Sequence, residues 1–163
     1  MSTVTFCRME SPIGPLTLAV ANEGLREIRF ADSEKRAATD PSWKEDSSAL
    51  GDALRELRAY FAGELETFDL RLAPEGTPFQ QRVWSELLKI PYGETISYGE
   101  LARRIGNPNA SRAVGLANGS NPIPIVIPCH RVIGSNGKLT GYGGGLPVKE
   151  KLLALEKRQL TLL

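Results

Sequence analysis

The chain has few of the residues that bind metals or form disulfides. Its 163 residues include two cysteines, Cys7 and Cys129, and a single histidine, His130. A structural zinc site takes four cysteine or histidine ligands, so these three residues cannot complete one. The sequence predicts neither a metal nor any other cofactor. A disulfide between the two cysteines remains open, but a reducing cytosol disfavours it, and two free thiols are the better expectation.

Long apolar runs are also missing. No stretch approaches the ~18 residues that a membrane span requires, and Pro124 interrupts even the apolar run at 123–127. The first ten residues lack a basic segment followed by an apolar one, so no secretory signal is expected. Apolar residues make up 41% and charged residues 24% of the chain, as in folded globular proteins. We therefore expect a cytoplasmic protein that has no membrane partner.

The net charge of +1 conceals two halves of opposite sign. Residues 1–76 contain nine basic and fourteen acidic side chains, whereas residues 77–163 contain eleven basic and five acidic ones. The second half is therefore the one suited to a polyanion such as nucleic acid. Solvated protein surfaces often carry a similar excess, so charge alone leaves that function open.

The first half is predicted to be a small sheet covered by one helix. Three short antiparallel strands are expected at residues 3–9, 16–21 and 25–30. A loop is expected at 31–46 and a further strand at 68–72. Apolar residues recur at spacings of four, three and four from Leu50 to Phe61, which predicts an amphipathic helix that stops at Gly63. We expect Cys7 to be a structural thiol in an edge strand.

The second half is predicted to be mostly helical. Residues 77–80 and 97–100 each read as a capping box that opens a helix, the second of which ends at Gly106. A third helix is expected at about 109–118. Its inward residues should be Ala110, Ala113, Val114 and Ala117. The last two helices resemble a helix-turn-helix, although helical pairs of this kind are also common packing units without a DNA role.

These elements define the expected architecture. The Pro/Gly-bearing segment 73–76 marks a boundary between domains at residues 1–76 and 77–163. We predict an α+β fold, with a small N-terminal antiparallel-sheet domain that has a covering helix, and a mostly helical C-terminal domain that contains the helix-turn-helix.

The residues that could carry chemistry lie within 121–134, directly after an apolar, strand-like run that ends at Pro128. Cys129 adjoins the only histidine, and the thiolate form of cysteine is the nucleophile. A neighbouring base and the positive charge of Arg131 could shift the ionisation of the thiol. In an extended chain, neighbouring side chains point to opposite faces, so His130 could reach the thiol only if the backbone turns or a water bridges them. A third group must orient the imidazole, and Glu150 and Glu156 are the acidic candidates. A buried thiol beside a core histidine is the simpler alternative.

Four short motifs resemble those of one known family. They are residues 112–115 (Arg-Ala-Val-Gly), 121–122 (Asn-Pro), 128–132 (Pro-Cys-His-Arg-Val) and 141–146 (Gly-Tyr-Gly-Gly-Gly-Leu). In this pattern the chain closely resembles the O6-alkylguanine-DNA alkyltransferases, densely from Thr77 to Glu156. The resemblance implies direct-reversal repair: an SN2 transfer of an alkyl group from O6-alkylguanine, and from O4-alkylthymine, in double-stranded DNA to Cys129. Each molecule would act once, as a monomer, on a base flipped out of the duplex.

The resemblance also implies roles for individual residues. His130 would act on Cys129 through a bridging water, Glu156 would orient His130, and Asn121 would hold the backbone of the site. On the DNA side, Arg112 would fill the space of the extruded nucleotide and Tyr98 would assist rotation of its phosphate. Ala113 and Gly115 share the DNA-binding helix with Arg112. The substrate pocket would be lined by Tyr98, Pro124, Val132, Tyr142, Gly143 and Lys149.

Two other functions compete with alkyl transfer. A helix-turn-helix lesion sensor would grip alkylated DNA and recruit other factors without using the thiol. A cysteine hydrolase would need catalytic turnover and an oxyanion site, and the sequence has no separate signal for one. Alkyltransferase-like proteins replace the nucleophile, and Cys129 places this chain outside that group.

Overall fold

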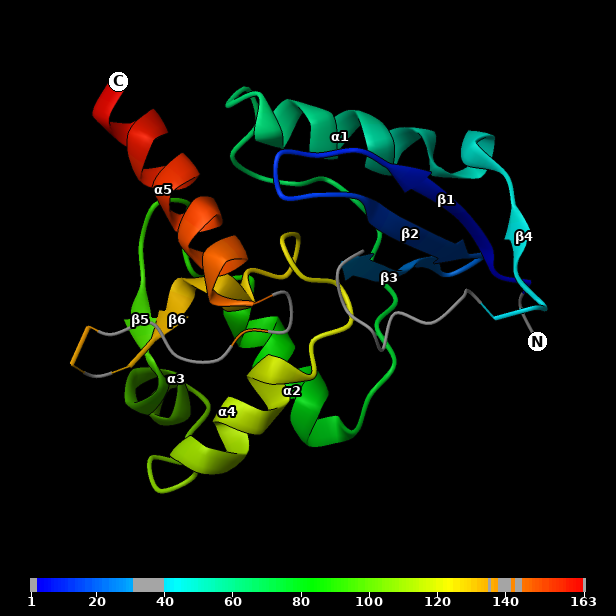
Figure 1. The fold of residues 1–163 in the computed structure, drawn as a ribbon. Coiled ribbons are helices and arrows are strands. Elements are labelled where there is room, and N and C mark those ends of the chain that lie inside the picture. The colour runs from blue at the N-terminus through cyan, green and yellow to red at the C-terminus, as the bar shows by residue number, and fades with distance from the viewer. Residues whose placement is uncertain (1–2, 31–39, 135, 138–141, 143–144, 163) are drawn as a thin grey trace. The chain divides into compact units, whose positions relative to one another are not determined.

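The structure is a computed structural model, which describes residues 3–30, 40–134, 136–137, 142 and 145–162. The chain divides into two compact units, Met1–Glu75 and Gly76–Leu163. The first contains a small sheet with a helix, and the second is mostly helical (Figure 1). This layout confirms the α+β fold class. Among the described residues, no helix is long and apolar enough to cross a membrane.

The first unit is built on a four-stranded sheet of order β3-β2-β1-β4. The antiparallel strands are β1 (Thr5–Met9), β2 (Leu16–Ala21) and β3 (Gly24–Phe30), close to the predicted positions. The short strand β4 (Lys44–Glu45) pairs parallel to β1, so the sheet is mixed rather than purely antiparallel. Because β1 lies between two strands, the prediction that Cys7 sits on an edge strand was wrong.

The strand expected at 68–72 is reduced to a single bridge. Leu72 makes an isolated parallel bridge to Leu25, whose backbone bonds Arg71 and Ala73 on either side. Pro74 follows at once, and proline has no N–H with which to extend a ladder. A strand therefore does not develop here.

Helix α1 (Gly51–Phe61) follows a 3₁₀ turn at Ser47–Leu50 and runs along the sheet (Figure 1). Leu57 and Tyr60 are fully buried, whereas Phe61, which the spacing placed on the apolar face, is only half-buried. The helix stops as predicted at Gly63, whose φ of 77° is in the left-handed region that favours glycine.

Helix α2 (Pro78–Leu87) begins the second unit with the predicted capping box. The Thr77 hydroxyl accepts from Gln80 N, and the Gln80 side chain accepts in return from Thr77 N. The indole N–H of Trp84, on the buried face of α2, donates to Ala117 O at 2.9 Å. This bond ties α2 to helix α4 (Ser111–Gly119).

Helices α3 (Tyr98–Arg104) and α4 form the predicted helix-turn-helix pair. The Ser97 hydroxyl caps α3 by accepting from Glu100 N at 3.0 Å. The Glu100 carboxylate binds Arg103 and Arg104 instead of closing the capping box. Of the four residues expected to face inward on the second helix, Ala113 is exposed, which corrects that prediction.

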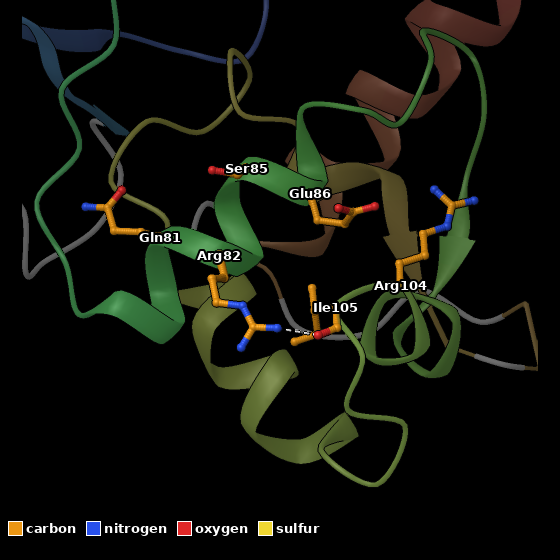
Figure 2. A pocket seen from close by; sticks show the side chains of 6 residues that line it. All are labelled: Gln81, Arg82, Ser85, Glu86, Arg104 and Ile105. Carbon is orange, nitrogen blue, oxygen red and sulfur yellow. Dashed lines mark hydrogen bonds between the residues drawn. The ribbon is translucent and has the colours of Figure 1, made fainter.

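A hollow of about 360 Å³ lies beside the junction of α2 and α3 (Figure 2). The Arg82 guanidinium reaches across it and donates to Ile105 O, at the C-terminal cap of α3. Cationic groups near a helix C-terminus satisfy its free carbonyls and oppose the negative end of its dipole. The side chain that crosses the hollow therefore has a structural role, because through Arg82 helix α2 holds the C-terminal end of α3.

The apolar run that ends at Pro128 is not the strand that its composition indicated. Pro122, Pro124 and Pro128 remove three backbone donors, and the chain forms turns up to a 3₁₀ segment at Cys129–Arg131. Only β6 (Val132–Ile133) is extended, and it pairs parallel with β5 (Ile96–Ser97). The long helix α5 (Leu146–Leu162) ends the unit.

Candidate active site

Asn121 shapes the loop that delivers the nucleophile. Its Oδ1 accepts from Ile123 N at 3.0 Å, and its Nδ2 donates to Ile127 O at 2.8 Å. Between these anchors, Ile125 has a φ of 76°, a conformation that β-branched residues rarely adopt. Strain of this kind costs on the order of 1–3 kcal/mol and persists only where the surroundings impose it. Here the Asn121 amide and the burial of Ile125 impose it.

The loop ends in the 3₁₀ turn that carries Cys129 and His130. Cys129 is 5% exposed and its thiol is free. Asn118, on α4, donates from Nδ2 to the Cys129 carbonyl at 3.3 Å. The backbone therefore turns at the cysteine, as the sequence argument required if Cys129 and His130 were to act together.

His130 is bonded to a carboxylate on the last helix. Its Nε2 lies 2.7 Å from Glu156 Oε2, and both side chains are buried. Of the two acidic candidates, the structure thus brings Glu156 to the histidine, whereas Glu150 is exposed. Burial alone would raise the pKa of Glu156, but hydrogen bonds and charge from His130 and Arg131 outweigh it and lower the pKa to about 2. The carboxylate is therefore ionised at neutral pH.

An ionised Glu156 determines how His130 is protonated. A carboxylate only accepts hydrogen bonds, so Nε2 must carry the proton, and in the neutral ring Nδ1 then holds a lone pair. Burial, the largest effect, lowers the pKa of His130 and keeps the ring neutral. Nδ1 is buried and has no hydrogen-bond partner in the described part of the chain. The imidazole is thus set up as a proton acceptor.

Arg131 is the member of the site that the sequence analysis misplaced. We expected its charge to act on the thiol, but its Nε and Nη2 bind the two oxygens of Glu156 at 2.8 and 3.0 Å. Its Nη1 donates to Ile90 O at 2.7 Å. The guanidinium therefore fixes the carboxylate that fixes the histidine. In the sequence, the only sign that Arg131 belongs to the site is that it directly follows His130.

The thiol of Cys129 is not activated by its resting environment. Burial raises its pKa, although hydrogen bonds from Asn121 and Tyr142 and the charge of Lys149 act in the opposite direction. An unperturbed cysteine is already mostly protonated at neutral pH. The thiol therefore stays protonated until a base removes its proton.

Lys149 ties three elements together behind the thiol. It is fully buried, and its Nζ donates to Val132 O at 2.7 Å. The same Nζ lies 6.0 Å from the ring centroid of Tyr98, the first residue of α3. Burial lowers the pKa of Lys149. Three of the predicted pocket residues, from α5, β6 and α3, are therefore brought together.

Three of the four predicted DNA-binding residues lie on α4, and the fourth, Tyr98, begins α3. Arg112 and Ala113 are exposed, and Gly115 lies against Tyr98, because a Cβ at Gly115 would be 3.8 Å from that ring. Leu116, one turn after Arg112, is 73% exposed. An open depression of about 470 Å³ is lined by Tyr98, Gly115, Leu116, Gly119 and Ser120. The sequence analysis did not single out Leu116, which only its exposure in the structure reveals.

The remaining pocket predictions have separate outcomes. Pro124 is buried in the Asn121 loop, and the side chain of Tyr142 is one of the groups that act to lower the pKa of the Cys129 thiol. Gly143 lies outside the described residues.

Two family models together match most of the chain. Residues 5–74 match the ribonuclease-like domain of 6-O-methylguanine DNA methyltransferase, and residues 78–158 match its DNA-binding domain.

Relatives match the chain over nearly its whole length. A methylated-DNA–protein-cysteine methyltransferase of Methanosarcina acetivorans is 60% identical over 90% of this chain and 94% of the relative. One from Mycobacterium bovis is 57% identical over 91% and 90%. The crystal structure of Mycobacterium tuberculosis OGT in complex with DNA superposes with a TM-score of 0.89 at 55% identity, covering 95% of this chain and 94% of that one. The chain therefore belongs to the 6-O-methylguanine DNA methyltransferase family, which confirms the resemblance inferred from its motifs.

Proposed function

We propose that the protein repairs DNA by direct reversal, moving the alkyl group of O6-alkylguanine onto the sulfur of Cys129. Its family and the names of its relatives support DNA repair by alkyl transfer. The observation that carries the assignment to this site is a buried free thiol next to a histidine that a buried carboxylate holds at 2.7 Å.

The histidine supplies the base that the resting thiol lacks. His130 Nδ1 takes the thiol proton through a bridging water, and Glu156 stabilises the imidazolium that forms. Ionising an ordinary cysteine completely at neutral pH is worth about 2 kcal/mol, or some thirtyfold in rate. Because burial raises the pKa of Cys129 further, base assistance is worth more here.

The chemical step is an in-line displacement at carbon. The thiolate of Cys129 attacks the alkyl carbon, the carbon–O6 bond breaks, and its electron pair stays on the guanine oxygen. The guanine then gains a proton, which balances the one that the thiol lost. The product is a thioether, whose carbon–sulfur bond does not break under these conditions, so the alkyl group stays on Cys129. Transfer is therefore irreversible, and one molecule repairs one lesion.

The α3–α4 pair delivers the damaged base. Arg112 enters the minor groove and fills the space of the extruded nucleotide, while Tyr98 assists rotation of the phosphate and contacts the base. Ala113 and Gly115 leave the backbone of α4 free to approach the groove. Base extrusion costs a few kcal/mol, less where alkylation has weakened pairing, and these contacts offset that cost.

The partner is double-stranded DNA that contains O6-alkylguanine, and O4-alkylthymine is a second substrate of the same pocket. The protein works as a monomer in the cytoplasm. Its two free thiols support a reducing compartment. Residues 77–163 are the DNA-binding and transfer domain and residues 1–76 a separate domain, a division supported by the two compact units.

The test is mass spectrometry after incubation with a duplex that carries one O6-methylguanine. We expect one added methyl group, mapped to Cys129, and none in Cys129→Ser. Cys7→Ser is the matched control and should be methylated like the wild type, because Cys7 is a buried thiol of the other unit. An unmodified protein that still retains the lesion-bearing duplex would instead support the lesion sensor.

A further inference from the structure

A tight turn between α2 and β5 contacts the carboxylate of the site. The Glu94 N–H donates to Pro91 O at 3.1 Å, which closes the turn at 91–94. The N–H of Gly93, inside this turn, donates to Glu156 Oε1 at 3.3 Å. A segment that lies outside the sequence motifs thus reaches the group that holds His130.

Gly93 supplies the fourth N–H donor to this carboxylate. Oε1 accepts from Gly93 N and from Arg131 Nε at 2.8 Å. Oε2 accepts from Arg131 Nη2 at 3.0 Å and from His130 Nε2 at 2.7 Å. An ionised carboxylate has about four acceptor positions on its two oxygens. The four donors share one negative charge, so the pull of Glu156 on His130 depends on the other three donors.

The residues around the turn also hold the cation of the site. Arg131 Nη1 donates to Ile90 O at 2.7 Å, and the guanidinium carbon lies 5.7 Å from the ring centroid of Tyr92. A guanidinium within about 6 Å of an aromatic ring is attracted to its face. Residues 90–93 therefore contact both members of the buried ion pair.

The backbone conformation of Gly93 decides which way its N–H points. Its φ is 82°, whereas the φ of Tyr92 is not positive, which makes this a type II turn. Type I and type II turns differ by a rotation of about 180° of the central peptide, here the one between Tyr92 and Gly93. In a type I turn the Tyr92 carbonyl would face Glu156 in place of the N–H. The type II turn requires glycine or asparagine at this position.

We propose that the turn at 91–94 is a positioning element for the base of the reaction. Its Gly93 N–H offsets part of the charge on Glu156, and the smaller remaining charge leaves His130 neutral and able to accept the thiol proton. This inference rests on the proposed function, because it takes His130 to be the base of alkyl transfer.

The charged groups around His130 act in two directions. Burial lowers its pKa, and the charges of Arg131, in the same 3₁₀ turn, and of Lys149, on α5, act in the same sense. The hydrogen bond and charge of Glu156 raise it. Removing a donor from Glu156 strengthens this opposing effect, so the pKa of His130 should rise. A protonated ring cannot take the proton of Cys129.

The experiment changes the turn type and observes the histidine directly. His130 is the only histidine of the chain, so ¹⁵N NMR of the untagged protein reports its tautomer and pKa without DNA. Gly93→Val disfavours a positive φ, and Gly93→Ala does so more mildly, whereas Gly93→Asn tolerates it. Gly63→Val, at a φ of 77° in the first unit, is the matched control.

We expect the wild-type ring to carry its proton on Nε2 and to titrate below its ordinary pKa of about 6.5. In Gly93→Val the pKa of His130 should rise by roughly half a unit to one unit, the scale of one hydrogen bond. Gly93→Ala should shift less in the same direction. Gly93→Asn and Gly63→Val should titrate like the wild type.

Single-turnover methyl transfer from O6-methylguanine in duplex DNA is the second measurement. The rate falls on the acid side as His130 is protonated. The midpoint of this fall should move to higher pH in Gly93→Val, by the same amount as the NMR titration, and the rate at higher pH should approach that of the wild type. A structural defect alone would lower the rate equally at every pH and leave the midpoint in place.

Three results would overturn the proposal. An unchanged titration in both Gly93→Val and Gly93→Ala would show that the turn does not act on His130. An equal shift in Gly93→Asn would show that any side chain at this position has the effect, and an equal shift in Gly63→Val would trace it to lower stability. If the wild type transfers no methyl group, the proposed function fails, whereas an unchanged titration beside normal methyl transfer overturns this inference alone.

Discussion

Glu156 binds His130 through Oε2 at 2.7 Å and Arg131 through both of its oxygens, so one buried carboxylate serves two consecutive residues. The arrangement couples the proton acceptor of the site to the stability of the fold. Arg131 is 6% exposed, and the ionised Glu156 carboxylate is the charge that compensates its guanidinium in the protein interior.

Replacing the carboxylate by an amide tests this coupling. Glu156→Gln leaves the Arg131 charge buried without its partner, which costs about 3–5 kcal/mol in comparable pairs, and it no longer fixes the proton on His130 Nε2. We expect a large loss in the free energy of unfolding, measured with urea, and a rate of methyl transfer at least tenfold lower. Glu150→Gln, on the exposed face of the same helix, is the matched control and should change neither.

The lowered pKa of Glu156 predicts a dependence of stability on pH. Its pKa falls from an ordinary 4.5 to about 2 on folding, so its contribution is complete above pH 4.5 and is lost as the pH falls toward 2. The amount at stake is about 3 kcal/mol. His130, whose pKa is also lowered, begins the loss below its ordinary pKa of about 6.5. Urea unfolding from pH 7 to pH 2 should show this decline, and a smaller one in Glu156→Gln.

Lys149 is predicted to set the reactivity of the thiol. Its charge favours the thiolate of Cys129, so Lys149→Met should raise the pKa of that thiol and slow its alkylation by iodoacetamide without DNA. The midpoint of the rate against pH should move to higher pH. Lys151→Met, which removes an exposed charge from the same helix, should leave the midpoint in place. An unchanged profile in Lys149→Met would argue against electrostatic control.

Arg112 and Leu116 are predicted to contribute to DNA binding in different ways. Both lie on the exposed face of α4. Arg112→Ala should weaken binding and reduce the slope of log affinity against log salt by about 1, because a positive charge that displaces counterions from the DNA is lost. Leu116→Ala should weaken binding severalfold, roughly in line with the apolar area removed, and leave the slope unchanged.

Leu88→Ala is the control for this pair, because Leu88 is also exposed but caps α2. The affinities are measured by fluorescence anisotropy at several salt concentrations. Equal changes in slope for the two α4 variants would contradict the division of roles.

Local sequence signals predicted most of the helices and the first sheet. The capping box at Thr77 and the stop at Gly63 depend on neighbouring residues, so the sequence contains all the information that they require. The resemblance also pointed to the pairing of His130 with Glu156. These two residues are 26 positions apart, so sequence periodicity could not have revealed their contact.

The sequence-based predictions that were wrong concern features that depend on contacts between distant segments of the chain. Apolar composition indicated a strand in the run that ends at Pro128, but the prolines of this run and the Asn121 hydrogen bonds impose turns instead. Arg131 was assigned to the thiol because it is close in sequence, whereas α5 brings it a carboxylate. Cys7 was placed at an edge because β4, of two residues, is too short to have a period.

The burial of Cys129 has a consequence for how long the protein keeps its capacity. Oxidants and stray electrophiles react with exposed thiolates, and they convert cysteine to sulfenic and then to irreversible sulfinic and sulfonic acids. A cysteine that is 5% exposed, and whose thiol has a raised pKa, is a poor target for them. If each molecule accepts one alkyl group on Cys129, as proposed above, any side reaction at that thiol would remove a whole repair event. Under the proposed function, the closed, protonated thiol thus keeps each molecule in reserve until alkylated DNA arrives.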